Sequence, residues 1–243
     1  MNTIESRVCA YWTERADDFL VIRQKELRDP ITALWTAEFR KYLPVDQILN
    51  ILDVGTGTGY FSILLAKEGH KVTGIDLTPA MIEGAKKMAV AESVQAEFCV
   101  MNAQELEFNE GTFDAVVTRN LTWTLPDPVK AYSEWLRVLK PGGVLMNFDA
   151  DYANSVRNGG EVSKAGKKDN IYCHDRIDQR LLQENAEITL SMPVSRESRP
   201  DWDINCLKQL GVASCGSDLS AGERIQRELV NIHSPLFLVW AKK

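Results

Sequence analysis

The chain has 243 residues, a formal net charge of -6 at pH 7 and 44% hydrophobic residues. This length suits one domain with modest additions and is short for two full domains. The acidic balance excludes partners that bind through phosphate neutralisation, because a nucleic-acid surface needs clustered Lys and Arg.

The N-terminal residues 1–19 carry acidic and polar side chains, where a secretory signal needs a basic start and an apolar core. No apolar run in the sequence is long enough to span a bilayer. The cysteines form no CxxC pair and lie scattered at Cys9, Cys99, Cys173, Cys206 and Cys215. This pattern favours neither a disulfide framework nor a zinc ribbon, so we expect a cytoplasmic protein without a membrane span and without a metal.

Strand-like and helix-like segments alternate through residues 46–150, which predicts a parallel sheet with helices on both faces. The expected strands are residues 48–55, 71–76, 96–103, 112–119 and 143–150. The expected helices are residues 60–69, 77–89 and 129–140. Thr78 and Asp127 each precede a proline and are typical helix starts, and Pro141–Gly143 is interpreted as the end of the last helix.

Two regions of different character flank this core. Residues 1–45 have a helical pattern and many aromatic side chains, so we expect an N-terminal helical cap. Residues 151–200 are polar, with one helix expected within residues 176–190. Their position after a strand end predicts an inserted lid or substrate region. Residues 201–243 resume the alternation and are expected to complete the core.

Gly55, Gly57 and Gly59 stand at alternate positions between the first strand and the first helix. Such a loop brings bare backbone and the positive end of a helix up to a ligand. The spacing is GxGxG, and Tyr60 stands at the third glycine of the dinucleotide motif GxGxxG, which argues against a pyrophosphate ligand. Asp76, at the end of the second strand, suits a ribose diol. The open alternative is that the glycines only form a tight turn.

Five segments in order, residues 51–59, 74–86, 101–108, 113–128 and 139–150, resemble the class I S-adenosylmethionine-dependent methyltransferases. The tail, residues 201–243, is similar to the last helix and reversed strand pair of that family. The resemblance implies a Rossmann-like, doubly wound α/β sheet of seven strands, mostly parallel with one antiparallel strand. It also implies S-adenosyl-L-methionine as cofactor, S-adenosyl-L-homocysteine as product, and in-line methyl transfer to a small-molecule acceptor.

The resemblance also assigns cofactor contacts. The glycine loop would approach the methionine moiety, Asp53 would help shape this loop, and Asp76 would bind the ribose. Leu77 and Met81 would cover the adenine ring, and the backbone carbonyl of Arg119 would lie near the amino group of the cofactor. Asn102 would accept from the adenine amino group where the family usually has an aspartate. The implied cofactor-binding residues are Asp53, Gly55, Thr56, Gly57, Gly59, Asp76, Leu77, Met81, Asn102, Ala103 and Arg119. Ordinary helix packing remains an alternative for Met81, and a surface salt bridge remains one for the side chain of Arg119.

Residues 119–125 follow the fourth strand at the sheet edge where open α/β sheets bind ligands. Asn120 and Trp123, with Tyr11 from the cap, are therefore the catalytic candidates, because aromatic faces can favour a sulfonium. A core role for Trp123 remains open. Leu121 and Thr122 replace two prolines of the DNA amino-methyltransferases, which is a further argument against a nucleic-acid acceptor.

No histidine is a strong candidate for a general base. His70 is interpreted as a solvated helix-end residue, His174 as a lid side chain within reach of the site, and His233 has no supporting pattern. The cysteines of the C-terminal half are a weak match to the arsenite methyltransferases, and ordinary thiols are the simpler interpretation. Two other functions stay open: an NAD(P)-dependent oxidoreductase on a similar sheet, and an S-adenosylmethionine-binding protein without turnover. The sequence indicates neither the acceptor nor the oligomeric state.

Overall fold

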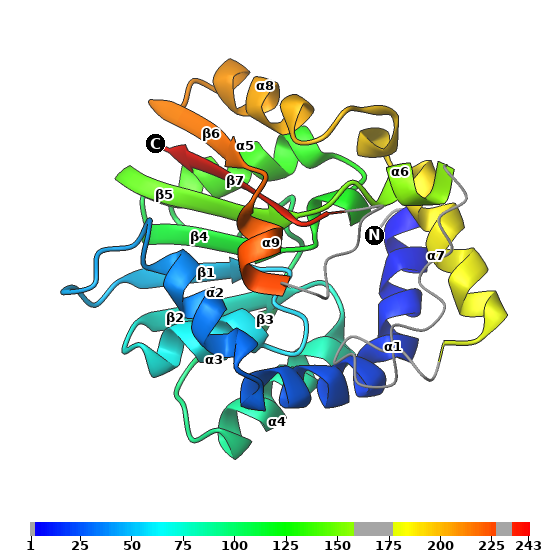
Figure 1. The fold of residues 1–243 in the computed structure, drawn as a ribbon, viewed down its shortest axis with the longest axis horizontal. Coiled ribbons are helices and arrows are strands. Elements are labelled where there is room, and N and C mark those ends of the chain that lie inside the picture. The colour runs from blue at the N-terminus through cyan, green and yellow to red at the C-terminus, as the bar shows by residue number, and fades with distance from the viewer. Residues whose placement is uncertain (1–2, 158–176, 227–234) are drawn as a thin grey trace.

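The computed structural model describes residues 3–157, 177–226 and 235–243, and a seven-stranded sheet lies at its centre (Figure 1). The strands are β1 (Asn50–Val54), β2 (Lys71–Asp76), β3 (Glu97–Val100), β4 (Phe113–Arg119), β5 (Leu139–Asp149), β6 (Ser214–Asp218) and β7 (Phe237–Lys242). Their order is β3-β2-β1-β4-β5-β7-β6, and β7 runs antiparallel to both of its neighbours. The predicted sheet, mostly parallel with one reversed strand, is confirmed.

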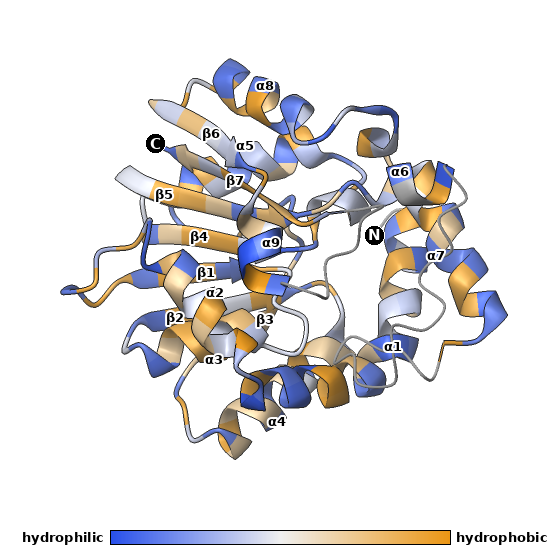
Figure 2. Ribbon diagram, in the orientation of Figure 1, coloured by the Kyte–Doolittle hydropathy of each residue, from blue (hydrophilic) through white to orange (hydrophobic). Residues whose placement is uncertain are grey.

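Helices cover both faces of the sheet. They are α1 (Thr3–Arg28), α2 (Ile31–Phe39), α3 (Tyr60–Lys67), α4 (Pro79–Ala91), α5 (Pro128–Val138), α6 (Tyr152–Arg157), α7 (Gln179–Ser191), α8 (Asp201–Gln209) and α9 (Ala221–Gln226), with 3-10 turns η1 (Thr122–Thr124) and η2 (Pro193–Arg196). Side chains of α2, α3, α4 and α9 share one hydrophobic core, and those of α5 and α8 share the other. Long parts of β4 and β5, which lie between these helices, are hydrophobic (Figure 2).

The N-terminal region contains two helices with different positions. The long helix α1 lies beside the sheet edge and contacts α4 and α7 (Figure 1). The short helix α2 instead belongs to the core, because its Trp35 and Phe39 pack against Phe61 and Phe148 with ring centroids 4.8 to 5.8 Å apart. Only α1 therefore has the place expected of a cap.

The junction of α5 and β5 differs from the prediction. The helix expected over residues 129–140 ends at Val138, and β5 already begins at Leu139. Leu139 pairs with Phe113, and the register then shifts before Val144 pairs with Ala115. Gly142 has a φ of +78°, which favours glycine. The proline–glycine–glycine segment is thus an irregularity within the strand pairing rather than a helix end.

The region expected as a lid contains α6, α7 and η2. The predicted helix agrees with α7, whereas α6 was not among the predicted elements. Cys173, His174 and His233 lie outside the described residues. None of the described helices combines the length and the apolar character that crossing a bilayer requires.

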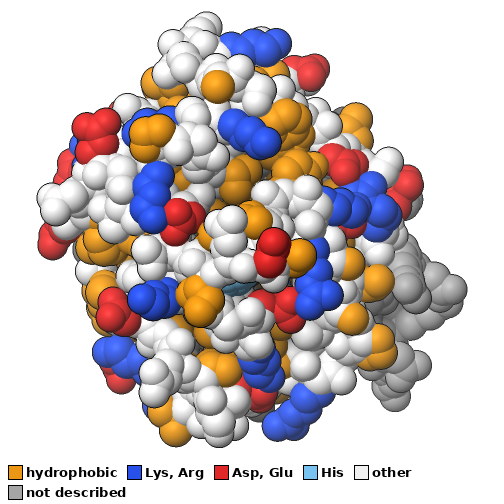
Figure 3. Space-filling model, turned by 90° about the vertical axis from the view of Figure 1, so that its left-hand side faces the viewer, with side chains coloured by type: hydrophobic (Ala, Val, Ile, Leu, Met, Phe, Trp, Pro, Cys, Tyr) orange, Lys and Arg blue, Asp and Glu red, His pale blue; other side chains and the backbone are white. Residues whose placement is uncertain are grey.

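The face turned away from α1 mixes acidic, basic and apolar side chains (Figure 3).

Candidate functional site

The three glycines after β1 all have positive φ, of +67°, +54° and +87°, but their surroundings differ. A Cβ on Gly55 would lie 2.8 Å from Leu121, and one on Gly59 would lie 3.0 Å from Ala85. A Cβ on Gly57 would meet none of the described residues within 4 Å. Gly55 and Gly59 are therefore explained by packing within the protein, whereas Gly57 faces open space.

We predict that Gly57→Ala reduces binding of S-adenosylhomocysteine more than tenfold while lowering the unfolding free energy by only about 1 kcal/mol, the cost of left-handed backbone at alanine. Gly211→Ala is the matched control, because Gly211 also has a positive φ, of +80°, and also faces open space. Calorimetric titration and urea denaturation measure the two effects. Equal ligand affinity in the two variants would contradict a ligand at Gly57.

Asp53 forms the floor of the glycine loop. Its Oδ2 accepts from Thr56 Oγ1 (2.6 Å), from the backbone N–H of Ser62 (3.0 Å) and from Ser62 Oγ (2.7 Å). Burial raises the pKa of Asp53 to about 6, against the opposing effect of these hydrogen bonds. The carboxyl group therefore fixes the loop to the start of α3, as the prediction of a loop-shaping role requires.

Asp76 joins the glycine loop to the start of α4. Its Oδ2 accepts from the backbone N–H of Gly57 (3.0 Å), and its Oδ1 accepts from that of Thr78 (2.8 Å). Burial raises the pKa of Asp76, and the backbone hydrogen bonds oppose that rise. A carboxylate offers about four acceptor positions, so the two backbone bonds leave capacity for a ligand diol. Thr78 itself makes no side-chain capping bond to α4.

The two expected adenine-covering side chains have different surroundings. Met81 is 2% exposed, as its packing interpretation requires. Leu77 is half-buried, and its carbonyl oxygen lies 3.9 Å from Cys9 Sγ of α1. Helix α1 therefore passes over the end of β2.

Asn102, after β3, uses its side chain within the protein. Its Oδ1 accepts from the backbone N–H of Gln104 (2.9 Å). Its Nδ2 donates to Glu5 of α1 (3.2 Å), and Gln104 Nε2 donates to the same Glu5 oxygen (2.9 Å). The carbonyl oxygen of the adjacent Ala103 accepts from Trp135 Nε1 (2.9 Å). Sequence reasoning missed Glu5 at this position, because the contact joins residues 97 apart.

The interpretation of Arg119 as a surface salt-bridge partner is wrong. Its side chain is 9% exposed, lies 2.9 Å from a Glu26 oxygen and stacks 4.4 Å from the centre of the Trp35 ring. Burial raises the pKa of Glu26, but the Arg119 and Arg23 guanidinium groups outweigh it and hold the pKa at about 2. Glu26 thus stays ionised and ties α1 to the end of β4.

Asn120 combines two features typical of functional positions. Its φ is +57°, which is uncommon outside glycine. Its Oδ1 is buried without a hydrogen-bond partner in the described part of the chain. Its carbonyl oxygen accepts from Trp123 Nε1 (2.8 Å), so these two catalytic candidates are linked.

An aromatic cluster covers this end of the sheet. We call it the roof cluster; its buried members are Val8, Tyr11, Trp123, Leu181, Ile188, Met192 and Val194, with Ile4, Trp12, Tyr152, Ile177 and Trp202 packed against them. The rings of Trp12 and Trp123 lie 6.4 Å apart, and those of Trp123 and Tyr152 lie 5.0 Å apart. Tyr11 and Trp123 therefore belong to one cluster, and the core interpretation of Trp123 agrees with its burial.

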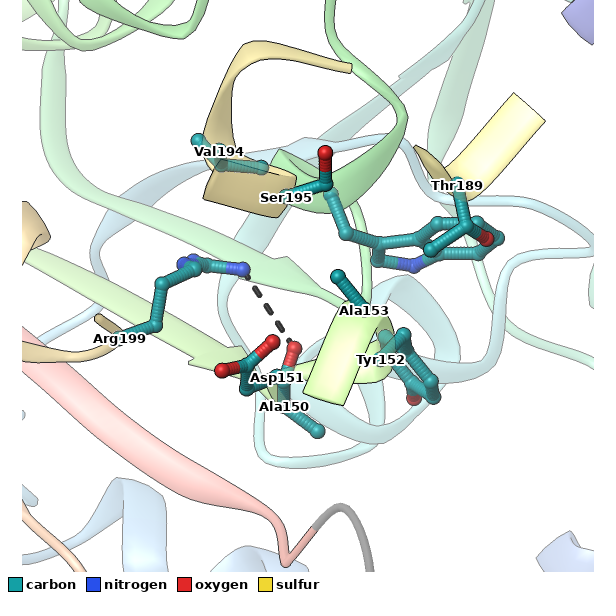
Figure 4. Close-up of a pocket in the computed structure, with 9 residues that line it drawn as sticks. Ala150, Asp151, Tyr152, Ala153, Thr189, Val194, Ser195 and Arg199 are labelled. Atoms are coloured by element: carbon teal, nitrogen blue, oxygen red, sulfur yellow. Dashed lines mark hydrogen bonds between the residues drawn. The ribbon is translucent and has the colours of Figure 1, made fainter. Parts of the chain in front are cut away.

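A small cavity lies between Trp123, Tyr152 and η2 (Figure 4). Its volume of about 10 Å³ is at the limit for one water molecule. Arg199 points into it and its guanidinium lies 3.5 Å from the carbonyl oxygen of Ala150. In this conformation the cavity is therefore too small for a ligand larger than water.

Arg199 belongs to a buried polar network that sequence reasoning missed. Its guanidinium donates to Asp203 through Nε (2.9 Å) and Nη2 (2.8 Å), and to Asp149 through Nη1 (2.9 Å). Tyr132 donates to Asp203 (2.7 Å), and Asn147 Nδ2 donates to Tyr132 (2.8 Å). Burial raises the pKa of Asp149 despite the neighbouring arginine. The network connects the end of β5 to the start of α8.

His70 lies away from this site. Its Nδ1 accepts from the backbone N–H of Leu49, immediately before β1 and so at the opposite sheet edge (3.3 Å). It is half-buried, and burial lowers its pKa, so the interpretation of a solvated residue is wrong. Burial raises the pKa of the Cys206 thiol to about 11, which fits an inert thiol. Within the described ranges, no group of His, Cys, Asp and Glu residues is arranged to hold a metal.

Comparison with known proteins identifies the class of this core. Residues 52–147 match the methyltransferase domain family. The chain is 37% identical over 125 residues to a demethylmenaquinone methyltransferase of Listeria monocytogenes, covering 49% of this chain and 52% of the relative. It is 38% identical over 96 residues to a ubiquinone biosynthesis O-methyltransferase of Xanthomonas oryzae, covering 39% and 40%. The chain thus spans about half the length, or less, of these relatives.

A solved structure shares the fold. The phosphoethanolamine N-methyltransferase 2 of Haemonchus contortus, in complex with phosphomonomethylethanolamine and S-adenosylhomocysteine, aligns with a TM-score of 0.61 at 18% identity, covering 86% of this chain and 52% of that one. The resemblance that the five sequence segments indicated is therefore confirmed. The match to the methyltransferase domain family at residues 52–147 runs from β1 to β5.

Proposed function

We propose that the chain is an S-adenosylmethionine-dependent methyltransferase that acts on a small-molecule acceptor. The observation that carries the proposal is the hydrogen bond from the backbone N–H of Gly57 to the Asp76 carboxylate, at the carboxyl ends of β1 and β2. It combines open space, among the described residues, in front of bare backbone with a half-buried carboxylate that has spare acceptor capacity. The matches to the methyltransferase domain and its relatives support the same class.

The residues at this edge fit the cofactor. Asp76 would accept from the ribose hydroxyls, and the loop around Gly57 would lie against the methionine moiety. The buried, unpartnered Oδ1 of Asn120 supplies an acceptor at the end of β4. The remaining implied contacts, which include Leu77, Ala103 and the carbonyl of Arg119, complete the proposed binding site.

The chemistry supplied by S-adenosylmethionine is a methyl group on a sulfonium, which an acceptor lone pair displaces in line. The protein's contribution is to align the acceptor and to keep water out. Asn120 and Trp123 stand where the acceptor would lie, and the aromatic rings of the roof cluster exclude water and favour positive charge. The hydroxyl of Tyr11 already accepts from Arg15 (3.1 Å) and Asn185 (3.2 Å), so Tyr11 would contribute to the roof cluster through its aromatic ring.

We propose an apolar, flat acceptor. The roof cluster is made of aromatic and aliphatic side chains from α1, α7, η1 and η2, and such surfaces suit aromatic ligands. The two relatives named for menaquinone and ubiquinone metabolism are compatible with this chemistry. Residues 1–45 and 151–200 would select the acceptor, and a cytoplasmic location stays a prediction from the cysteine pattern.

Thermal unfolding with and without ligand tests the proposal. A ligand that binds only the native state raises its stability by mass action, by about 2.7 kcal/mol at a hundred times its dissociation constant. We expect an upward shift of the midpoint with S-adenosylhomocysteine and none with NAD or NADP. A shift with NAD or NADP alone would favour the oxidoreductase alternative and remove the proposal.

A further inference from the structure

We propose that Glu5 of helix α1 is a specificity-determining residue, which accepts a hydrogen bond from the adenine amino group of the cofactor. This inference rests on the proposed function and names the residue that recognises the purine. The role expected of Asn102 would thereby pass to a carboxylate from a distant part of the chain.

The orientation of Asn102 is the first argument. Its Oδ1 accepts from the backbone N–H of Gln104 (2.9 Å) and also lies 3.3 Å from Gln104 Nε2. The acceptor atom of the amide is therefore used within the loop after β3. Its donor atom, Nδ2, points to Glu5. A donor cannot receive a hydrogen bond from an amino group, so Asn102 in this orientation does not replace the family's aspartate.

The position of Glu5 is the second argument. Its Oε1 accepts from two neutral amides, Asn102 Nδ2 (3.2 Å) and Gln104 Nε2 (2.9 Å), and the residue is 9% exposed. Gln104 is itself fixed, because its Oε1 accepts from the backbone N–H of Asp127 (2.6 Å). The two amides hold the Glu5 carboxylate next to Asn102, the residue that the family resemblance assigns to the adenine amino group.

The path of α1 is the third argument. Cys9, one turn after Glu5, reaches the carbonyl oxygen of Leu77 (3.9 Å), a residue expected to cover the adenine ring. The helix packs along α4, the element that follows the ribose-binding Asp76 (Figure 1). Glu5 and Cys9 therefore place one face of α1 over the nucleoside end of the proposed site.

The chemical consequence is a preference for a 6-aminopurine. An amino group donates to a carboxylate, whereas the carbonyl oxygen of a 6-oxopurine would face it as a second acceptor. A site built around one polar group rejects an analogue that cannot pair with it. We therefore expect the intact chain to bind S-adenosylhomocysteine more tightly than S-inosylhomocysteine, its 6-oxo analogue.

Calorimetric titration of both ligands into Glu5→Gln tests the inference. We expect the ratio of the two affinities to fall roughly tenfold, because a charge-assisted hydrogen bond is replaced by a neutral one and the new amide can donate to a 6-oxo group. Glu14→Gln is the matched control on the same helix, since Glu14 is exposed and pairs with Arg180 of α7. This variant should keep the parental ratio.

The double variant Glu5→Gln/Asn102→Asp moves the carboxylate to the family's position, and we expect it to regain the preference for the 6-aminopurine. An equal loss of both ligands in Glu5→Gln, with unfolding midpoints unchanged, would assign Glu5 a purely structural role and overturn the inference. An unchanged ratio in Glu5→Gln would overturn it as well. Failure of the parental chain to bind either ligand would instead remove the proposed function together with the inference.

Discussion

Arg199→Met should lower the free energy of unfolding by about 3 to 5 kcal/mol, the usual cost of leaving a buried charge without its partner. The Arg199 side chain is 1% exposed, and both carboxylates that it bridges, Asp149 and Asp203, are fully buried. Methionine fills a similar volume, so the loss reports on charge rather than on a cavity. Urea denaturation at pH 7 measures it.

The pH dependence of this variant follows from the direction of the Asp149 shift. Burial raises the pKa of Asp149 even beside Arg199, and removing the arginine should raise it further. A carboxyl group whose folded pKa is raised stabilises the protein at low pH and loses that contribution as the pH rises. The deficit of Arg199→Met should therefore shrink as the pH is lowered from 8 toward 4.

Arg7→Met is the matched control for Arg199→Met. Arg7 also bridges two carboxylates, Glu184 (2.8 Å) and Glu187 (3.0 Å), but its side chain is 42% exposed. Solvent screens exposed ion pairs and leaves them little effect on stability, so this variant should stay close to the parental stability. Similar losses in Arg199→Met and Arg7→Met would show that burial does not govern the strength of the Arg199 network.

The sheet and the cofactor edge were predictable from sequence because their signals are local. The glycine loop, Asp76 and the proline at the start of α4 lie within 25 residues, and each has its own backbone requirement. The same local reasoning failed at Pro141–Gly143. Leu139 pairs there with Phe113, 26 residues earlier, so the last two residues of the expected helix belong to β5 instead.

The long-range contacts around the site could not be predicted in the same way. Glu5 reaches Asn102, Glu26 reaches Arg119 and Arg199 reaches Asp149, each across 50 or more residues. No periodicity encodes such contacts, because they depend on how α1 and the segment after α7 return to the sheet. Charged residues are normally exposed, so a surface salt bridge was a reasonable expectation for Arg119, whereas packing buries its side chain against Glu26.

Asp76→Ala should weaken binding of S-adenosylhomocysteine by about 100-fold or more. The carboxylate accepts from Gly57 and Thr78 in the protein and would accept from two ribose hydroxyls in the complex. Hydrogen bonds to a charged group contribute about 1.5 to 3 kcal/mol each, and 1.4 kcal/mol corresponds to a tenfold change in affinity. Calorimetric titration measures the change.

Asp114→Ala separates ligand recognition from backbone support in that experiment. Asp114 also accepts from a backbone N–H, that of Asn50 (2.8 Å). It lies at the start of β4, however, and so at the amino-terminal ends of the parallel strands, opposite to Asp76. Both variants lose a carboxylate that accepts from a backbone N–H, whereas only Asp76→Ala should lose the ligand. Burial raises the pKa of Asp76, so this carboxylate takes up a proton at a higher pH than an exposed aspartate does. The affinity of the parental chain for the ligand should therefore begin to fall at a correspondingly higher pH. Parental affinity in Asp76→Ala would exclude the ribose role and leave Asp76 as a support for the glycine loop alone.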